Sequence, residues 1–200
     1  MRQPWLVVLY AVAMGILEAA VVVYLRRIYY PDGFGFPLVP MEPGILRIEV
    51  LREATTLVML ACVAGLAAES AWPRLMAFLV AFGVWDIVYY AGLKLFLDWP
   101  ASWLEPDILF LIPNVWVGPV LAPVLVSVLW IAAGLTLHRH PIRMRAADWI
   151  GAIAAAFAIL ISFLVPAGVP EAPRFAWWLF GSGFALGAVT LFGIFRRRAG

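Results

Sequence analysis

Six long apolar stretches dominate the chain, and polar residues gather between them and in narrow stripes within the first three. The stretches lie near residues 5–25, 45–67, 74–97, 115–137, 148–166 and 175–195. Each has about the 20 residues that an α-helix needs to cross a hydrocarbon core roughly 30 Å thick. The connections between them are short. The pattern therefore predicts an all-α bundle of about six transmembrane helices, forming a single integral membrane domain over residues 1–200.

Proline and glycine interrupt this regular pattern. The fourth stretch begins with the run VWVGP at 115–119 and has Pro123 one turn later. Because proline breaks the hydrogen bonding of a helix, a kinked fourth helix is predicted. Segment 98–114 is predicted to form a short interfacial helix followed by a turn. The Pro- and Gly-rich segment 26–44 is not helical, and it is either an ordered cap over one end of the bundle or a plain interfacial connector.

Composition supports the membrane class. The chain is 65% hydrophobic and 13% charged, whereas soluble domains average about 25% charged residues. The sequence has no basic segment interleaved with aromatic residues, so no nucleic-acid partner is predicted. The single cysteine, Cys62, excludes an internal disulfide.

Basic residues cluster after the fourth stretch, at 138–145, and after the sixth, at 196–198. With an even number of spans between the chain ends, both clusters share a side with Arg2 and Arg74. The positive-inside rule makes that side cytoplasmic. The chain is therefore predicted to lie in the plasma (cytoplasmic) membrane, with both termini in the cytoplasm. In a cell that has two membranes, this is the inner membrane. Three arginines fall on the outer side and count against this orientation: Arg26, Arg27 and Arg174.

Ionisable side chains share one face of each of the first three helices. The first helix carries Glu18 beyond its middle. The second has residues at offsets of three, four and seven, which fall on one helix face: Glu49, Arg52, Glu53 and Thr56. The third has residues at successive i, i+4 steps: Asp86, Tyr90 and Lys94. In the predicted orientation all of them lie in the outer half of the membrane, as do Asp107 and Asn114 of the following segment.

A charge at the centre of a bilayer costs roughly 2.5–3.5 kcal/mol on insertion scales, so these groups need partners. The acids outnumber the bases, which leaves a surplus of negative charge. Either a carboxylic acid keeps its proton or a cation binds. Oxygen ligands favour Mg²⁺, Mn²⁺ or Ca²⁺, and the candidate ligands are Glu18, Glu49, Glu53 and Asp86.

The stripes predict a membrane-embedded enzyme that acts on a lipid or lipid-linked anionic headgroup. The candidate general acids and bases are Glu49, Glu53 and Asp86. The candidate substrate-binding residues are Arg52, Lys94, Tyr90 and Asn114.

Three other interpretations stay open. The first is a small proton- or cation-coupled transporter. The second is a non-catalytic subunit or assembly factor of a larger membrane complex. In that case a homo-oligomer or partner chain docks on the small residues of spans five and six: Gly151, Ala154, Ala158, Gly183 and Gly187. The third is purely structural ion pairing of Arg52 with Glu18 or Glu49, and of Lys94 with Asp86. Membrane lipids are expected partners in every case.

Overall fold

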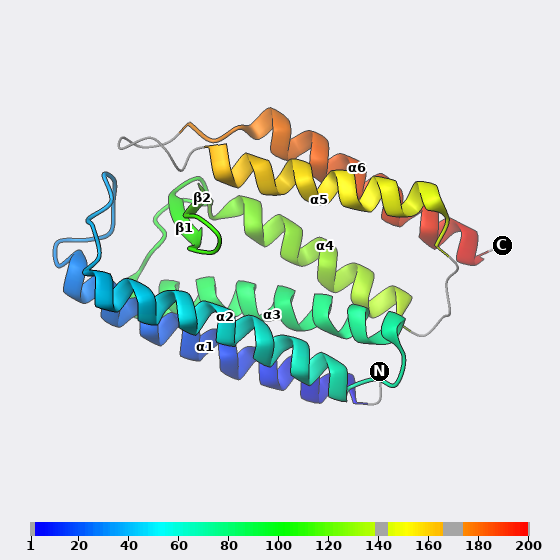
Figure 1. Cartoon of the computed structure of the whole chain (residues 1–200), viewed down its shortest axis with the longest axis horizontal. Coiled ribbons are helices and arrows are strands. Elements are labelled where there is room, and N and C mark those ends of the chain that lie inside the picture. The colour runs from blue at the N-terminus through cyan, green and yellow to red at the C-terminus, as the bar shows by residue number, and fades with distance from the viewer. Residues whose placement is uncertain (1–2, 139–143, 166–173, 200) are drawn as a thin grey trace.

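Six helices and one two-stranded hairpin make up the part of the chain that the computed structural model describes, residues 3–138, 144–165 and 174–199. The helices are α1 (Pro4–Tyr29), α2 (Pro43–Leu66), α3 (Ala71–Leu97), α4 (Leu121–Leu137), α5 (Ala146–Leu164) and α6 (Trp177–Ala199). They run along the long axis of the molecule, and α1 begins at the same end of the bundle as α6 finishes (Figure 1). Within the basic cluster at 138–145, residues 139–143 lie outside the described residues.

The apolar stretches predicted the positions of the six helices to within a few residues, apart from the start of the fourth. Among the described residues, four helices are long and apolar enough to cross a membrane: α1, α3, α5 and α6. The chain is therefore a helical membrane protein. Helix α2 carries a polar stripe, and α4 has only 17 residues, which rise about 26 Å. The six-span topology accordingly stays a prediction.

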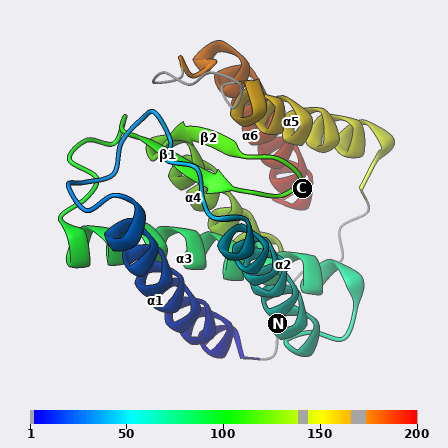
Figure 2. The same cartoon turned by 60° about the vertical axis from the view of Figure 1, so that its left-hand side comes forward.

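The segment between α3 and α4 differs from the prediction. It forms an antiparallel hairpin of β1 (Pro106–Phe110) and β2 (Trp116–Pro119), with Asp107 opposite Gly118 and Phe110 opposite Trp116. The predicted interfacial helix is absent from this described segment, and α4 begins only at Leu121, after the proline-rich run. The predicted start of the fourth helix is thus a strand that ends at Pro119. In a two-stranded sheet both strands are edge strands, which tolerate proline. The hairpin lies over one end of the bundle (Figure 2).

Close helix contacts arise where small residues meet backbone. A Cβ atom at Gly15 of α1 would lie 2.7 Å from the carbonyl oxygen of Trp85 in α3. A Cβ atom at Gly83 of α3 would lie 2.7 Å from the carbonyl oxygen of Ser127 in α4. These two glycines let α1 and α4 each pack closely against α3, and the approach of α4 brings Ser127 to Asp86.

The small residues of α5 and α6 pack against each other. A Cβ atom at Gly183 would lie 2.9 Å from the Cβ of Ala158, and one at Gly151 would lie 2.6 Å from Oγ1 of Thr190. Gly151, Ala158 and Gly183 therefore make a close helix contact inside the chain, whereas Ala154 is exposed. The predicted docking of a partner chain or second copy on spans five and six stays a prediction.

Candidate functional site

A chamber of about 660 Å³ runs between the two halves of the bundle. Its walls come from all six helices and both strands. Helix α2 packs against α3 and α1, whereas α5 packs against α6 and β2, so the chamber passes between α2 and α5. The residues of α3 that line it run from Trp72 to Tyr90, which is a rise of about 27 Å. The chamber is thus long and narrow.

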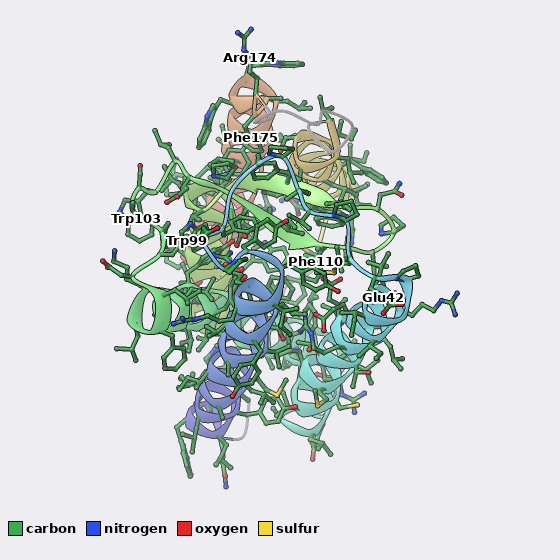
Figure 3. All side chains as sticks on the ribbon, turned by 90° about the vertical axis from the view of Figure 1, so that its left-hand side faces the viewer. Glu42, Trp99, Trp103, Phe110, Arg174 and Phe175 are labelled. Carbon is green, nitrogen blue, oxygen red and sulfur yellow. The ribbon has the colours of Figure 1, made fainter. Side chains whose placement is uncertain are left out.

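The charged side chains of the chamber lining lie toward its hairpin end. The charged residues in its lining are five carboxylates and two arginines: Glu18, Glu49, Glu53, Asp86, Asp107, Arg26 and Arg52. Toward the other end, the lining contributed by α3 is apolar, with Trp72, Leu75, Met76 and Leu79. In the end-on view of Figure 3, Phe110 lies near the centre of the hairpin end, whereas Trp103 and Arg174 lie at its edge.

Arg52 binds two carboxylates. Its Nε donates to Glu49 Oε2 at 2.8 Å, one helical turn away, and its Nη1 donates to Glu18 Oε1 of α1. Thr56 donates a weaker hydrogen bond of 3.4 Å to the other oxygen of Glu18. The stripes of α1 and α2 therefore meet, as the sequence predicted. Because both acids hold it, Arg52 does not present a free guanidinium to an anionic group.

Glu53 joins α2 to the hairpin. Its two carboxylate oxygens accept the backbone N–H of Leu111, at 2.9 and 3.2 Å. The side chain is buried and lines the chamber. Within the described structure it forms no ion pair. Glu53 is therefore a carboxylate oriented by a backbone donor and without an ion-pair partner among the described residues.

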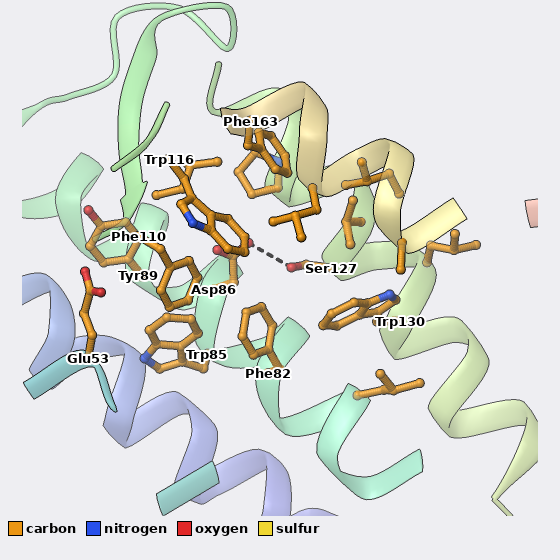
Figure 4. A pocket seen from close by; sticks show the side chains of 18 of the residues that line it. Glu53, Phe82, Trp85, Asp86, Tyr89, Phe110, Trp116, Ser127, Trp130 and Phe163 are labelled. Carbon is orange, nitrogen blue, oxygen red and sulfur yellow. Dashed lines mark hydrogen bonds between the residues drawn. The ribbon is translucent and has the colours of Figure 1, made fainter. Parts of the chain in front are cut away.

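Asp86 lies at the middle of α3 against α4. Its Oδ2 accepts a hydrogen bond from Ser127 Oγ at 2.8 Å, and only 8% of the residue is exposed. Phe82, Trp116 and Trp130 are among the aromatic side chains around it (Figure 4). No basic side chain of the described residues pairs with it. The alternative of an Asp86–Lys94 ion pair is therefore wrong.

A third ion pair, which the sequence analysis did not predict, lies at the hairpin end of the bundle. Arg26 of α1 donates through Nη2 to Asp107 Oδ1 of β1 at 2.8 Å, and both residues are buried. The guanidinium lies 3.8 Å from the ring centroid of Trp99 and 4.2 Å from that of Phe34. Burial raises the pKa of Asp107, and the charge of Arg26 opposes that rise. Arg26 Nη1 is buried and has no hydrogen-bond partner among the described residues.

Phe34 belongs to the segment that joins α1 to α2, and both Phe34 and Tyr30 line the chamber. Tyr30 also holds this segment in place, because its hydroxyl accepts the backbone N–H of Val39 at 2.9 Å. The prediction that segment 26–44 is not helical is wrong at its ends, because residues 26–29 belong to α1 and residues 43–44 to α2. Of the two alternatives for the remaining residues 30–42, the structure shows the ordered cap.

Three predicted substrate-binding residues lie apart from Arg52. Tyr90 is buried in the chamber wall, close to Asp107. Lys94 and Asn114 do not line the chamber. The Lys94 side chain is 53% exposed, and its Nζ lies 2.7 Å from Asp98 Oδ1. The hydrogen bond from Lys94 lowers the pKa of Asp98. Lys94 thus turns to the acid one turn later and leaves the stripe.

The carboxylates do not assemble as one ligand set. Glu18 and Glu49 bind Arg52, Glu53 binds the hairpin backbone and Asp86 binds Ser127. Among the described residues, no three Asp, Glu, His or Cys side chains are placed to hold one metal ion. The geometry therefore gives the predicted divalent cation no support.

No protein-family model, curated protein or solved structure matches this chain.

Proposed function

We propose that the protein is a membrane-embedded enzyme that holds one lipid-like molecule in the chamber and performs acid–base chemistry at the polar end of that molecule. The observation that carries the proposal is one continuous cavity with buried carboxylates toward one end and mostly apolar walls over the rest of its length. Its volume falls within the range of small-molecule sites, about 300–1,000 Å³. A long apolar cavity between helices suits an extended hydrocarbon chain.

The proposed chemistry centres on the two carboxylates of the chamber that form no ion pair with an arginine. A general acid or base must gain and lose a proton during the reaction, and an acid held by an arginine resists protonation. Glu49, a catalytic candidate by sequence, is held in this way by Arg52. Glu53 and Asp86 are not. We therefore assign the proton transfer to Glu53 and the contact with the polar end of the substrate to Asp86.

The charge balance bears on the substrate. Five carboxylates face two arginines in the chamber, and both arginines are already paired. A further anion would add to a negative surplus in a place with little water, which is unfavourable. The chamber therefore favours a neutral or cationic polar end over the anionic headgroup expected from the sequence.

Reconstitution into vesicles of extracted membrane lipids tests the enzyme directly. We expect mass spectrometry to show a lipid product that accumulates with the wild-type protein and forms about 10²–10⁴-fold more slowly with Glu53→Gln, the usual range for a lost acid–base group. Asp98→Asn, an exposed acid at the end of α3, is the matched control and should retain the rate. If the wild-type protein forms no product, or if Glu53→Gln forms it at the wild-type rate, the proposed chemistry is wrong.

Transport of the same molecule is the second candidate, and the length of the chamber favours it. A cavity that follows α3 for about 27 Å covers most of a hydrocarbon core roughly 30 Å thick. In the same vesicles, transbilayer movement of lipid without any new lipid species would support transport and contradict the enzyme.

We also propose that the chain lies in the plasma membrane with its hairpin end outside. The Arg26–Asp107 pair supports this orientation, because an arginine neutralised by a buried partner adds little to the positive charge of its side. We expect a cysteine introduced at Ser102, in a chain with Cys62→Ala, to react with an impermeant maleimide in intact cells. Reaction only after lysis would reverse the orientation.

A further inference from the structure

We propose that the polar end of the bound molecule is an organic ammonium that sits against Asp86 inside an enclosure of aromatic rings. This inference rests on the proposed function, since it names the class of molecule that the chamber holds. Three features carry it: an acceptor oxygen left open, aromatic faces without a cation, and a surplus of acid.

The first feature is the carboxylate itself. Asp86 Oδ2 accepts from Ser127, whereas Oδ1 accepts no hydrogen bond from any described residue, although the side chain lines the chamber. A buried carboxylate without a counter-charge is costly. Either a proton or a cationic group bound at Oδ1 removes that cost, and a cationic guest would displace the proton.

The second feature is the set of rings around this carboxylate. The aromatic residues that line the chamber in this region are Phe82, Trp85, Tyr89, Phe110, Trp116, Trp130 and Phe163 (Figure 4). They touch one another: the ring centroids of Phe82 and Trp130 are 5.1 Å apart, and those of Phe110 and Trp116 are 5.3 Å apart. Such an enclosure binds ammonium groups through cation–π attraction.

No side chain of the described protein supplies that cation. Ring contacts with a guanidinium are made by Arg26, on Phe34 and Trp99, and by Arg196, on Phe192. Neither arginine lies over a ring of the enclosure. Among the described residues, no guanidinium therefore occupies the aromatic enclosure near Asp86.

The third feature is the charge of the whole chamber. With five carboxylates against two arginines, an ammonium lowers the negative surplus, whereas a neutral group leaves it unchanged. The apolar remainder of the chamber then holds the body of the guest. These features together define a lipophilic ammonium, such as an alkylamine or an alkyl trimethylammonium.

Titrations of the purified full-length protein in a neutral detergent test this inference through tryptophan fluorescence. The probes are dodecyltrimethylammonium, its neutral counterpart dodecanol, and tetramethylammonium, which has the charge without the chain. We expect dodecyltrimethylammonium to bind at least about tenfold more tightly than either of the others. Asp86→Asn, which keeps the shape and the Ser127 contact, should remove most of that preference, whereas Asp98→Asn should retain it.

Trp130→Leu provides a second variant that leaves every charge in place. It should weaken binding of the ammonium probe and leave binding of dodecanol unchanged. If Asp86→Asn does not fold, this comparison alone tests the ammonium inference. Equal binding of dodecanol and the ammonium probe, or an unchanged preference in Asp86→Asn, would overturn the inference that the guest carries an ammonium group. The chamber would then remain a proposed site for a lipid of another kind. Failure of both long-chain probes to bind would overturn the proposed function itself.

Discussion

Replacing Arg26 with methionine is expected to lower the free energy of unfolding by about 3–5 kcal/mol, the usual cost of leaving one member of a buried ion pair alone. The variant removes the counter-charge of Asp107, of which only 2% is exposed. It also removes the guanidinium between Phe34 and Trp99. Because this residue joins α1, the cap and the hairpin, the loss should loosen the hairpin end of the bundle.

Thermal unfolding in detergent measures the effect. Arg27→Met is the matched control, because Arg27 follows on the same helix and is exposed; we expect its unfolding temperature to stay near that of the wild type. Combining Arg26→Met with Asp107→Asn should recover part of the loss, since the unpaired charge disappears. Equal unfolding temperatures for Arg26→Met and Arg27→Met would show that the pair contributes nothing.

The pH dependence of the Arg26→Met variant follows from the same pair. Burial raises the pKa of Asp107 in the folded state, and Arg26 opposes this rise, so its removal should raise the pKa further. A carboxyl group with a higher pKa when folded binds its proton more tightly in the folded state, so protonation favours folding. The stability deficit of the variant should therefore shrink as the pH falls through the pKa of Asp107.

The sequence was sufficient to place the helices, because each long apolar run is determined by local composition. It also placed the stripes of α1 and α2 on facing sides: Glu18 and Arg52 are 34 residues apart, yet each faced the predicted polar site. Periodicity within a helix reveals which residues share a face. It does not reveal which neighbouring element that face will meet.

The contacts that the sequence analysis did not predict have this cause in common: each joins elements whose neighbours cannot be read from periodicity. Arg26 and Asp107 are 81 residues apart, and the segment that carries Asp107 was expected to be helix and turn rather than a hairpin. Ser127 sits in an apolar helix, and only the close approach of α4 to Gly83 brings it to Asp86. Such pairings depend on tertiary packing.

Lys94 shows the opposite error. Its i, i+4 spacing from Asp86 and Tyr90 placed it on their stripe, but Asp98 lies at the same spacing on its other side. The exposed acid at the helix end is the better partner, because the ammonium stays in water there. A signal for this choice was present in the sequence, since Asp98 directly follows the third apolar stretch.

Apolar side chains exposed on α5, such as Ile150, Phe157 and Ile161, do not by themselves indicate a protein partner. In a membrane protein such residues face lipid, which is as apolar as they are. The interpretation as a subunit of a larger complex therefore gains no support from them.

The central claim is that the chamber between α2 and α5 holds an amphiphile. A bulky side chain introduced into the chamber lining should therefore prevent the amphiphile from binding. Ala156 of α5 lines the chamber, whereas Ala154, two residues earlier, does not. Ala156→Trp fills space that a guest needs, so it should abolish binding almost completely, and Ala152→Trp, one turn earlier on the lined face, should act alike. Ala154→Trp adds the same side chain outside the chamber and should retain binding.

Native mass spectrometry of the gently extracted protein is the most direct measurement. The account predicts that the wild-type protein and Ala154→Trp each carry the mass of one bound amphiphile, and that Ala156→Trp and Ala152→Trp carry none. A wild-type protein free of any amphiphile, or equal occupancy in all four proteins, would contradict it.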